Sequence, residues 1–153
     1  ETEYEILQVA QRIRDLGGHN HMFAFFPEQG SMMEDWPPVP QDQWRRVQLA
    51  RFVIDYAGGS IRDMAFDDRG RVVDFGLSVR ELDALIDSGK PFRTSGCPGK
   101  SDPQVSACNR PYGDSPPSAI RSYPFAPEGP DVGIIRRQMN GESISTVTDT
   151  DDS

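Results

Sequence analysis

The chain has 153 residues, of which 36% are hydrophobic and 26% are charged, and its formal net charge is −8. This length fits one domain, and the acidic balance argues against a surface for nucleic acid or anionic lipid. No apolar run approaches the roughly 20 residues that a membrane-spanning helix needs. The first residues show no signal-peptide pattern, so we expect a cytoplasmic protein in a reducing compartment.

Three helices are predicted from capping signals and apolar periodicity. Thr2 and Glu5, and later Ser78 and Glu81, have the spacing of capping boxes, and each pair precedes apolar residues at helical intervals. Between these two helices, residues 42–56 form another stretch with apolar residues at helical intervals, and a glycine pair ends it. We therefore expect helices that begin near these two capping boxes and a helix over 42–56.

Strands are predicted in the intervals between these helices. Residues 21–26 form an unbroken apolar run, which is typical of a strand buried on both faces of a parallel sheet. Residues 60–66 and 71–75 read as two further strands around a turn at 67–70. Helices and strands thus alternate, as in βα units packed on a mostly parallel sheet.

The expected fold is an α/β fold, a partial (β/α) barrel with a loop-rich C-terminal extension. Too few strands are present for a stable sheet, so the barrel should be incomplete. Residues 1–90 would supply its last βα units, and residues 91–130 would form a Cys-, Pro- and Gly-rich extension. Residues 131–153 are expected to form a disordered acidic tail.

Several stretches resemble the radical SAM proteins related to biotin synthase, including archaeal-type lipoyl synthases. The helix core RRVQLARFVI runs into SIRDMAF, and FAFFPEQGS precedes this pair. The segments PFRTSGCPG, CNRPYG and IRSYPF further resemble the C-terminal part of such proteins. The similarity covers roughly residues 1–127, and the loop motifs are its most specific part.

The resemblance implies an enzyme that uses an iron–sulfur cluster and S-adenosylmethionine for hydrogen abstraction, with sulfur insertion as one outcome. The Cys-x-x-x-Cys-x-x-Cys motif that binds the catalytic 4Fe–4S cluster in this family is not in the chain. The chain should therefore be inactive alone, and the remainder of the barrel would come from an N-terminal portion or a partner subunit that carries the motif.

Candidate site residues follow from the same resemblance. Glu28, Gly30 and Ser31 lie in a turn after the predicted strand 21–26, on the side where S-adenosylmethionine binds in the family. Arg62 matches an arginine that ligates an auxiliary cluster in biotin synthase, and its planar fork also suits a substrate carboxylate. The alternatives are an ordinary loop at 28–31 and an exposed arginine at 62.

Cys97 and Cys108 are the only two cysteines, and both lie beside turn-forming residues. They can be ligands of an auxiliary iron–sulfur or zinc centre, a disulfide, or inert thiols. Two thiolates do not complete a tetrahedral site, so a metal would need further ligands from other segments.

A second function of another class stays open at this point. The chain can be a non-catalytic α/β subunit, or a small acidic domain, with a zinc- or disulfide-stabilised loop that docks on a partner. The two functions differ in whether the chain contributes residues to a reaction or only to a complex.

Overall fold

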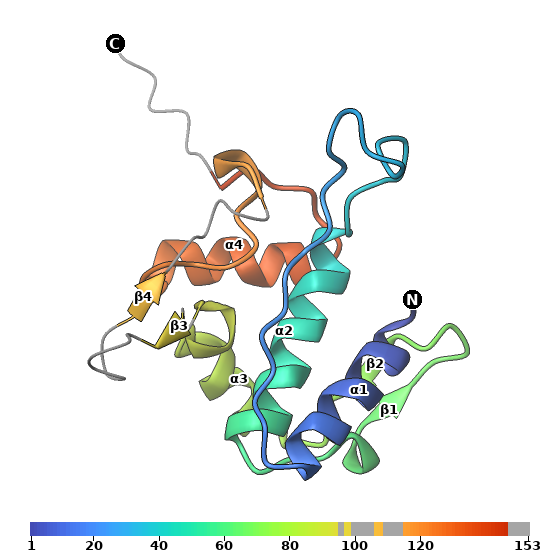
Figure 1. The fold of residues 1–153 in the computed structure, drawn as a ribbon. Coiled ribbons are helices and arrows are strands. Elements are labelled where there is room, and N and C mark those ends of the chain that lie inside the picture. The colour runs from blue at the N-terminus through green and yellow to red at the C-terminus, as the bar shows by residue number, and fades with distance from the viewer. Residues whose placement is uncertain (95–96, 99–105, 109–114, 147–153) are drawn as a thin grey trace.

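The computed structural model describes residues 1–94, 97–98, 106–108 and 115–146 (Figure 1). In that part of the chain the α-helices are α1 Glu3–Asp15, α2 Gln41–Tyr56, α3 Val79–Asp87 and α4 Gly129–Met139. The strands are short and pair as two antiparallel ladders: β1 Ala65–Phe66 with β2 Val72–Asp74, and β3 Cys97–Pro98 with β4 Ser106–Cys108. The fold is therefore helix-rich and mixed.

Both predicted capping boxes are confirmed. The Thr2 hydroxyl accepts a hydrogen bond from the Glu5 N–H at 3.2 Å, while the Glu5 carboxylate accepts one from the Thr2 N–H at 2.8 Å. Ser78 and Glu81 make the same reciprocal pair at the start of α3, at 3.3 and 2.9 Å. These bonds satisfy backbone donors that the first turn of a helix leaves free, so both helices begin where the sequence predicts.

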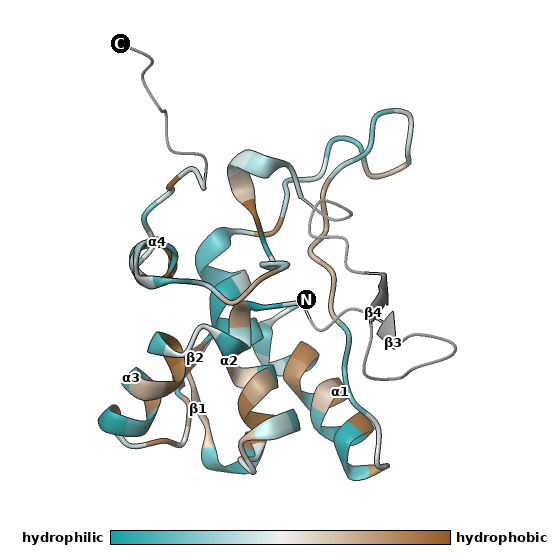
Figure 2. Ribbon diagram, turned by 90° about the vertical axis from the view of Figure 1, so that its left-hand side faces the viewer, coloured by the Kyte–Doolittle hydropathy of each residue, from teal (hydrophilic) through white to brown (hydrophobic). Residues whose placement is uncertain are grey.

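Helix α2 lies at the centre of the molecule and contributes to two apolar clusters. On one side Leu49 packs with residues of α3 and α4. On the other side Ala50, Val53 and Ile54 pack against α1 and β2. Figure 2 shows apolar residues of α1, α2 and α3 gathered toward the interior of the lower half of the molecule. A helix covered on several sides needs no single apolar face.

A buried arginine fastens the segment 120–123 to α2. The Arg45 guanidinium, on a residue only 1% exposed, donates to the carbonyl oxygens of Ile120 and Arg121 at 2.8 and 2.7 Å and to the side-chain oxygens of Gln48 and Gln138 at 2.8 and 2.9 Å. None of these acceptors is a carboxylate, and burial lowers the pKa of Arg45 to about 10. The group is still cationic at neutral pH.

The prediction of a partial (β/α) barrel is wrong. The described residues form no parallel sheet, and both ladders are antiparallel and only two or three residues long. The predicted strand 21–26 is extended, but it belongs to neither ladder and runs along α2 (Figure 1). Phe23 in this segment is 74% exposed, whereas a strand of a parallel barrel would be buried on both faces.

The second predicted strand, 60–66, is mostly replaced by a 3-10 turn at Ile61–Asp63. The Ser60 hydroxyl accepts a hydrogen bond from the Arg62 N–H at 3.2 Å and so competes with strand pairing. Only Ala65 and Phe66 remain in β1, which pairs with β2 through the predicted turn. The hairpin is thus confirmed, but it is shorter than expected.

Helix α4 was not predicted, and it spans the border at 130 between the expected extension and the expected tail. Pro130 stands in its first turn, and the Glu128 N–H donates to the Asp131 carboxylate at 3.0 Å. Val132 and Ile135 are buried against the cluster that contains Leu49. The proline and the acidic residue are helix-start signals that the sequence already contained.

Candidate binding groove

A groove of about 620 Å³ lies between the N-terminal half of α2, the extended segment 22–25 and the proline-rich loop 33–40. We call it the apolar groove. Its lining is dominated by large apolar side chains, among them Met22, Phe23, Phe25, Met33, Trp36 and Trp44. A volume of this size accommodates a small-molecule ligand or several side chains of a binding segment.

The floor of the groove is fixed by Trp44. The Trp44 indole N–H donates to the Arg121 carbonyl at 2.8 Å, and the residue is only 5% exposed. The wall opposite is held by the Val39 N–H, which donates to the Phe25 carbonyl at 3.3 Å. Residues 37–40 include three prolines, which lack an N–H donor and so favour an irregular wall over a strand. Trp44 therefore gives the groove a fixed floor, and the prolines keep the wall at 37–40 out of any sheet.

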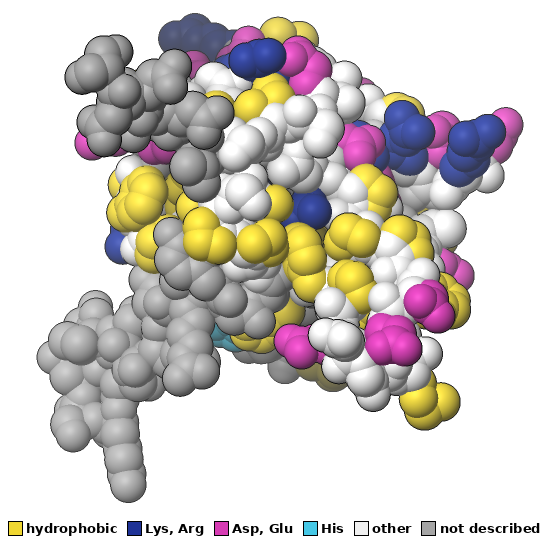
Figure 3. Space-filling model, turned by 90° about the horizontal axis from the view of Figure 1, so that it is seen from above, with side chains coloured by type: hydrophobic (Ala, Val, Ile, Leu, Met, Phe, Trp, Pro, Cys, Tyr) yellow, Lys and Arg dark blue, Asp and Glu magenta, His cyan; other side chains and the backbone are white. Residues whose placement is uncertain are grey.

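The rim of the groove exposes aromatic and sulfur-containing side chains to solvent. Phe23 is 74%, Trp36 61% and Met33 43% exposed. On the face seen in Figure 3, apolar side chains form a band across the molecule, a basic side chain lies within this band, and acidic side chains lie near its right-hand end. Contiguous exposed apolar surface beside a groove is typical of an interaction site.

Charged residues of both signs lie near the groove, and those on its lining and in its loop are acidic. Arg46, Arg69 and Arg71 line a neighbouring pocket that shares Glu1 with the groove. Glu1 lines it directly, and no lysine or arginine is found among the described lining residues. Glu34 and Asp35, both exposed, stand in the chain between the lining residues Met33 and Trp36. The arrangement therefore combines apolar side chains with an acidic rim.

The predicted ligand turn at Glu28, Gly30 and Ser31 is exposed, and its polar groups are used within its own loop. Gly30 has a φ of +82°, and its N–H donates to the Glu34 carboxylate at 2.6 Å. The Ser31 N–H donates to the Glu28 carbonyl at 3.1 Å, and the Ser31 hydroxyl accepts from the Met33 N–H at 3.3 Å. These bonds describe a self-contained loop, and binding of S-adenosylmethionine there stays a prediction.

Arg62 is not brought near this turn. It lies in the 3-10 turn Ile61–Asp63, where it is exposed, at the opposite end of the molecule in Figure 1 from the loop that contains Glu28. The predicted inward strand position does not exist, because the strand itself is replaced. Contact of Arg62 with a cluster or a substrate stays a prediction.

Cys97 and Cys108 lie in β3 and β4, while their side chains are outside the described part of the structure. The backbone register places the two residues opposite each other in the antiparallel ladder. In the part of the chain whose side chains are described, no group of three or more His, Cys, Asp or Glu residues could hold a metal ion. Metal ligation by the two cysteines stays a prediction.

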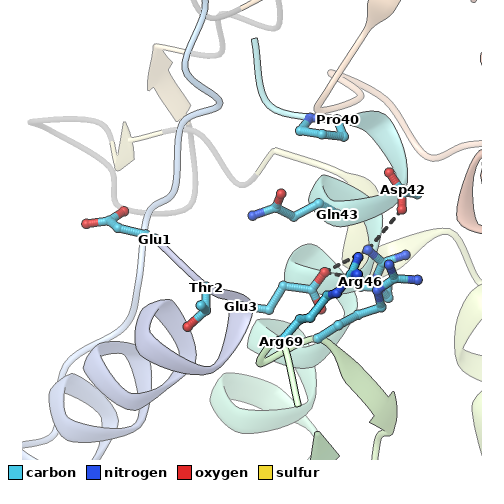
Figure 4. Close-up of a pocket in the computed structure, with 9 residues that line it drawn as sticks. Glu1, Thr2, Glu3, Pro40, Asp42, Gln43, Arg46 and Arg69 are labelled. Atoms are coloured by element: carbon cyan, nitrogen blue, oxygen red, sulfur yellow. Dashed lines mark hydrogen bonds and ion pairs between the residues drawn. The ribbon is translucent and has the colours of Figure 1, made fainter. Parts of the chain in front are cut away.

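A second, polar pocket of about 250 Å³ lies at the N-termini of α1 and α2 (Figure 4). Glu3 is buried, and its carboxylate accepts from the Arg46 side chain at 2.7 Å and from the Val72 N–H at 2.8 Å. Arg46 also pairs with Asp42 at 3.0 Å. The cluster ties α1, α2 and β2 together, and its charged groups neutralise one another, so we assign it a structural role.

Sequence reasoning missed the apolar groove. It assigned residues 21–26 to a strand buried on both faces of a sheet and 28–31 to a ligand turn or an ordinary loop. The available signal was the stretch SMMEDWPPVP, in which two methionines and a tryptophan stand outside any helical or strand period. Large apolar residues in such a loop have no core position to fill, which favours an exposed binding surface.

No family model matches the chain, and no curated protein or solved structure matches it significantly. The resemblance to radical SAM proteins therefore rests on the sequence motifs alone. None of the helices in the described part of the chain is both long and apolar enough to cross a membrane.

Proposed function

We propose that this chain is a docking module, which binds a basic amphipathic segment of a partner protein in the apolar groove. The observation that carries the proposal is the groove itself, where exposed Phe23 and Trp36 surround the buried Trp44 beside an acidic rim. A cytoplasmic location, expected from the sequence, belongs to the same proposal.

The apolar part of the groove supports the binding of apolar side chains. Aromatic residues and methionine are enriched in protein interfaces, where they bury large areas at a modest entropic cost. Methionine also adapts its shape to different partners because its side chain is unbranched and polarisable. Met22 and Met33 lie on the lining together with the aromatic residues, so the groove suits leucine-like and aromatic anchors.

The charge around the groove selects the polar face of the bound segment. The chain carries a net charge of −8, and the nearby Glu1, Glu34 and Asp35 are all acidic and exposed. A basic segment gains long-range attraction and a complementary rim, while an acidic segment is repelled. An amphipathic helix with lysines or arginines opposite its apolar face fits both requirements.

The lining supports binding better than a reaction. Its described residues include no serine, threonine, histidine or cysteine that could serve as nucleophile or general base. Glu1 and Gln43 are the polar members. The geometry therefore provides shape, apolar contact and charge.

The test uses a model peptide of leucine and lysine at helical spacing, titrated into the full chain. Trp36 and Trp44 are the only tryptophans, and both line the groove, so their fluorescence reports on its occupancy. We expect a saturable blue shift with one peptide per chain. A peptide in which glutamate replaces lysine should bind at least tenfold more weakly, because it meets the acidic rim.

Two matched variants locate the binding. Phe23→Asp changes an exposed groove residue and should weaken the lysine peptide at least tenfold, the size expected for loss of an aromatic anchor. Val79→Asp makes the same change in charge on α3, at a residue that is 79% exposed, and should leave the affinity unchanged. If Phe23→Asp leaves the affinity unchanged, as Val79→Asp should, the net charge alone attracts the peptide, and the proposal would be wrong.

A further inference from the structure

The two cysteines occupy facing positions in the ladder of β3 and β4. Cys97 is the register partner of Cys108, and the next pair along the ladder is Pro98 with Ser106. The chain has no other cysteine. The pairing is thus the one place in the chain where two thiol-bearing residues are neighbours.

Residues opposite each other in an antiparallel ladder belong to the same face of the sheet, and their Cα atoms lie about 4.5–5.5 Å apart. This range falls within the roughly 4.4–6.8 Å that disulfides span between Cα atoms. The register thus brings the two residues within the range of a disulfide, while the ladder is irregular between Cys97 and Pro98. We propose that Cys97 and Cys108 form a reversible disulfide across the β3–β4 ladder.

Both ends of the β3–β4 segment are attached to the core, which keeps the two strands close. Before β3, the Thr94 N–H donates to the Tyr123 carbonyl and the Tyr123 N–H donates to the Phe92 carbonyl, both at 2.8 Å. After β4, the buried Ser115 hydroxyl accepts from the Arg121 N–H at 3.2 Å. Two anchors on the same segment 121–123 raise the effective concentration of one cysteine near the other.

The reaction is a thiol–disulfide exchange with a small disulfide such as oxidised glutathione. The thiolate of one cysteine attacks the glutathione disulfide, forms a mixed disulfide and releases one reduced glutathione. The second cysteine then attacks the protein sulfur and releases the second reduced glutathione. Two protein thiols are oxidised to one disulfide, and one glutathione disulfide is reduced to two thiols.

A disulfide uses the pair without further ligands. A tetrahedral zinc or iron–sulfur site would need two or more additional ligands, which must come from other segments. In a reducing compartment a disulfide of this kind is typically transient and redox-sensing. The pair is therefore expected to open and close with the thiol–disulfide balance around the protein.

The experiment incubates the reduced full chain with oxidised glutathione and measures its intact mass and its free thiols. We expect a monomer that has lost two hydrogen atoms and has no free thiol, and dithiothreitol should restore both thiols. Cys97→Ser and Cys108→Ser should each gain one glutathione instead. An internal disulfide lowers the mass of the chain by two hydrogen atoms, whereas two mixed disulfides raise its mass by two attached glutathiones, so the intact mass distinguishes them.

A variant that shifts one cysteine along the ladder provides the control. Ser106→Cys combined with Cys108→Ser keeps two thiols but moves the second one opposite Pro98, so the internal bond should form at least tenfold more slowly. Circular dichroism checks that each variant retains the helical content of the parent. Two glutathiones on the parent chain, or bound zinc or iron that protects its thiols from oxidation, would overturn the proposal.

Discussion

At the scale of single residues, the most consequential side chain is one that sequence reasoning did not single out. Arg45 lies in the second turn of α2, and its guanidinium is also placed over the rings of Phe92 and Tyr123, at 5.8 and 5.5 Å from their centroids. Its hydrogen bonds hold two backbone carbonyls that no regular secondary structure satisfies. Arg45 therefore substitutes for missing backbone pairing between α2 and the segment 120–123.

Replacing this arginine should cost stability because the buried Ile120 carbonyl and two glutamine side-chain oxygens lose a donor, while the Arg121 carbonyl keeps hydrogen bonds from Trp44 and Gln48. Arg45→Ala is expected to lower the free energy of unfolding by about 3 kcal/mol, because buried oxygens lose a charged donor. Urea unfolding followed by circular dichroism measures the change. Arg62→Ala, at an exposed arginine, is the control and should stay within about 0.5 kcal/mol of the parent. Similar losses in both variants would refute the role assigned to Arg45.

Residue patterns predicted the local capping but not the long-range polar contacts. The Thr2–Glu5 and Ser78–Glu81 pairs were readable because their partners lie three residues apart. Arg45 meets acceptors 75 and 93 residues away in the chain, so no local pattern could identify them. The same limit applied to the burial of Glu3.

At the scale of elements, the helices were predicted better than the strands. A capped, periodic helix satisfies its own backbone, so its sequence signal survives in many folds. The apolar run 21–26 cannot satisfy its own backbone in this way, because whether an extended segment becomes a strand depends on the segments that lie beside it. Here the run lies along α2 and borders the apolar groove. Its apolar composition alone could not distinguish such a segment from a buried strand.

The N-terminal cap of α3 makes a prediction about acid sensitivity. Hydrogen bonds from the Ser78 side chain, and then from its backbone, lower the pKa of Glu81 below its usual value of 4.5. A carboxylate with a lowered folded pKa contributes stability above the unfolded pKa, and this contribution is lost as the pH falls through the folded pKa. Stability should therefore decrease with acidification below about pH 4.5.

Carboxyl NMR titration of Ser78→Ala tests this prediction. Without the hydroxyl, the pKa of Glu81 should rise toward 4.5, and the loss of the cap should cost about 1 kcal/mol at neutral pH. Ser31→Ala, in an exposed loop, is the matched serine control and should leave the Glu81 titration unchanged. An identical Glu81 pKa in the parent chain and in Ser78→Ala would contradict the capping account.

At the scale of the whole molecule, the expected barrel was replaced by helices around α2. The alternation of helices and strands in the sequence suggested βα units, but the strand segments are too short or too exposed to build a parallel sheet. Helix α4 instead covers one side of α2 and closes the cluster around Leu49.

The apolar groove and the cysteine pair are separate features of this molecule. The groove is lined by Glu1, Ile6 and residues within 22–47, whereas the pair lies in β3 and β4. The docking proposal therefore survives if the cysteines bind a metal, and the disulfide proposal survives if the groove binds nothing. Each has its own experiment for that reason.

The most direct test of the docking proposal observes the methionine methyl groups by NMR while the leucine–lysine peptide is added. Met22 and Met33 line the groove, whereas Met64 and Met139 pack with the two apolar clusters. We predict that the Met22 and Met33 signals shift and saturate with the same affinity as the tryptophan fluorescence, while those of Met64 and Met139 remain in place. A saturated complex in which the Met22 and Met33 signals do not move would show that the groove is not the docking site.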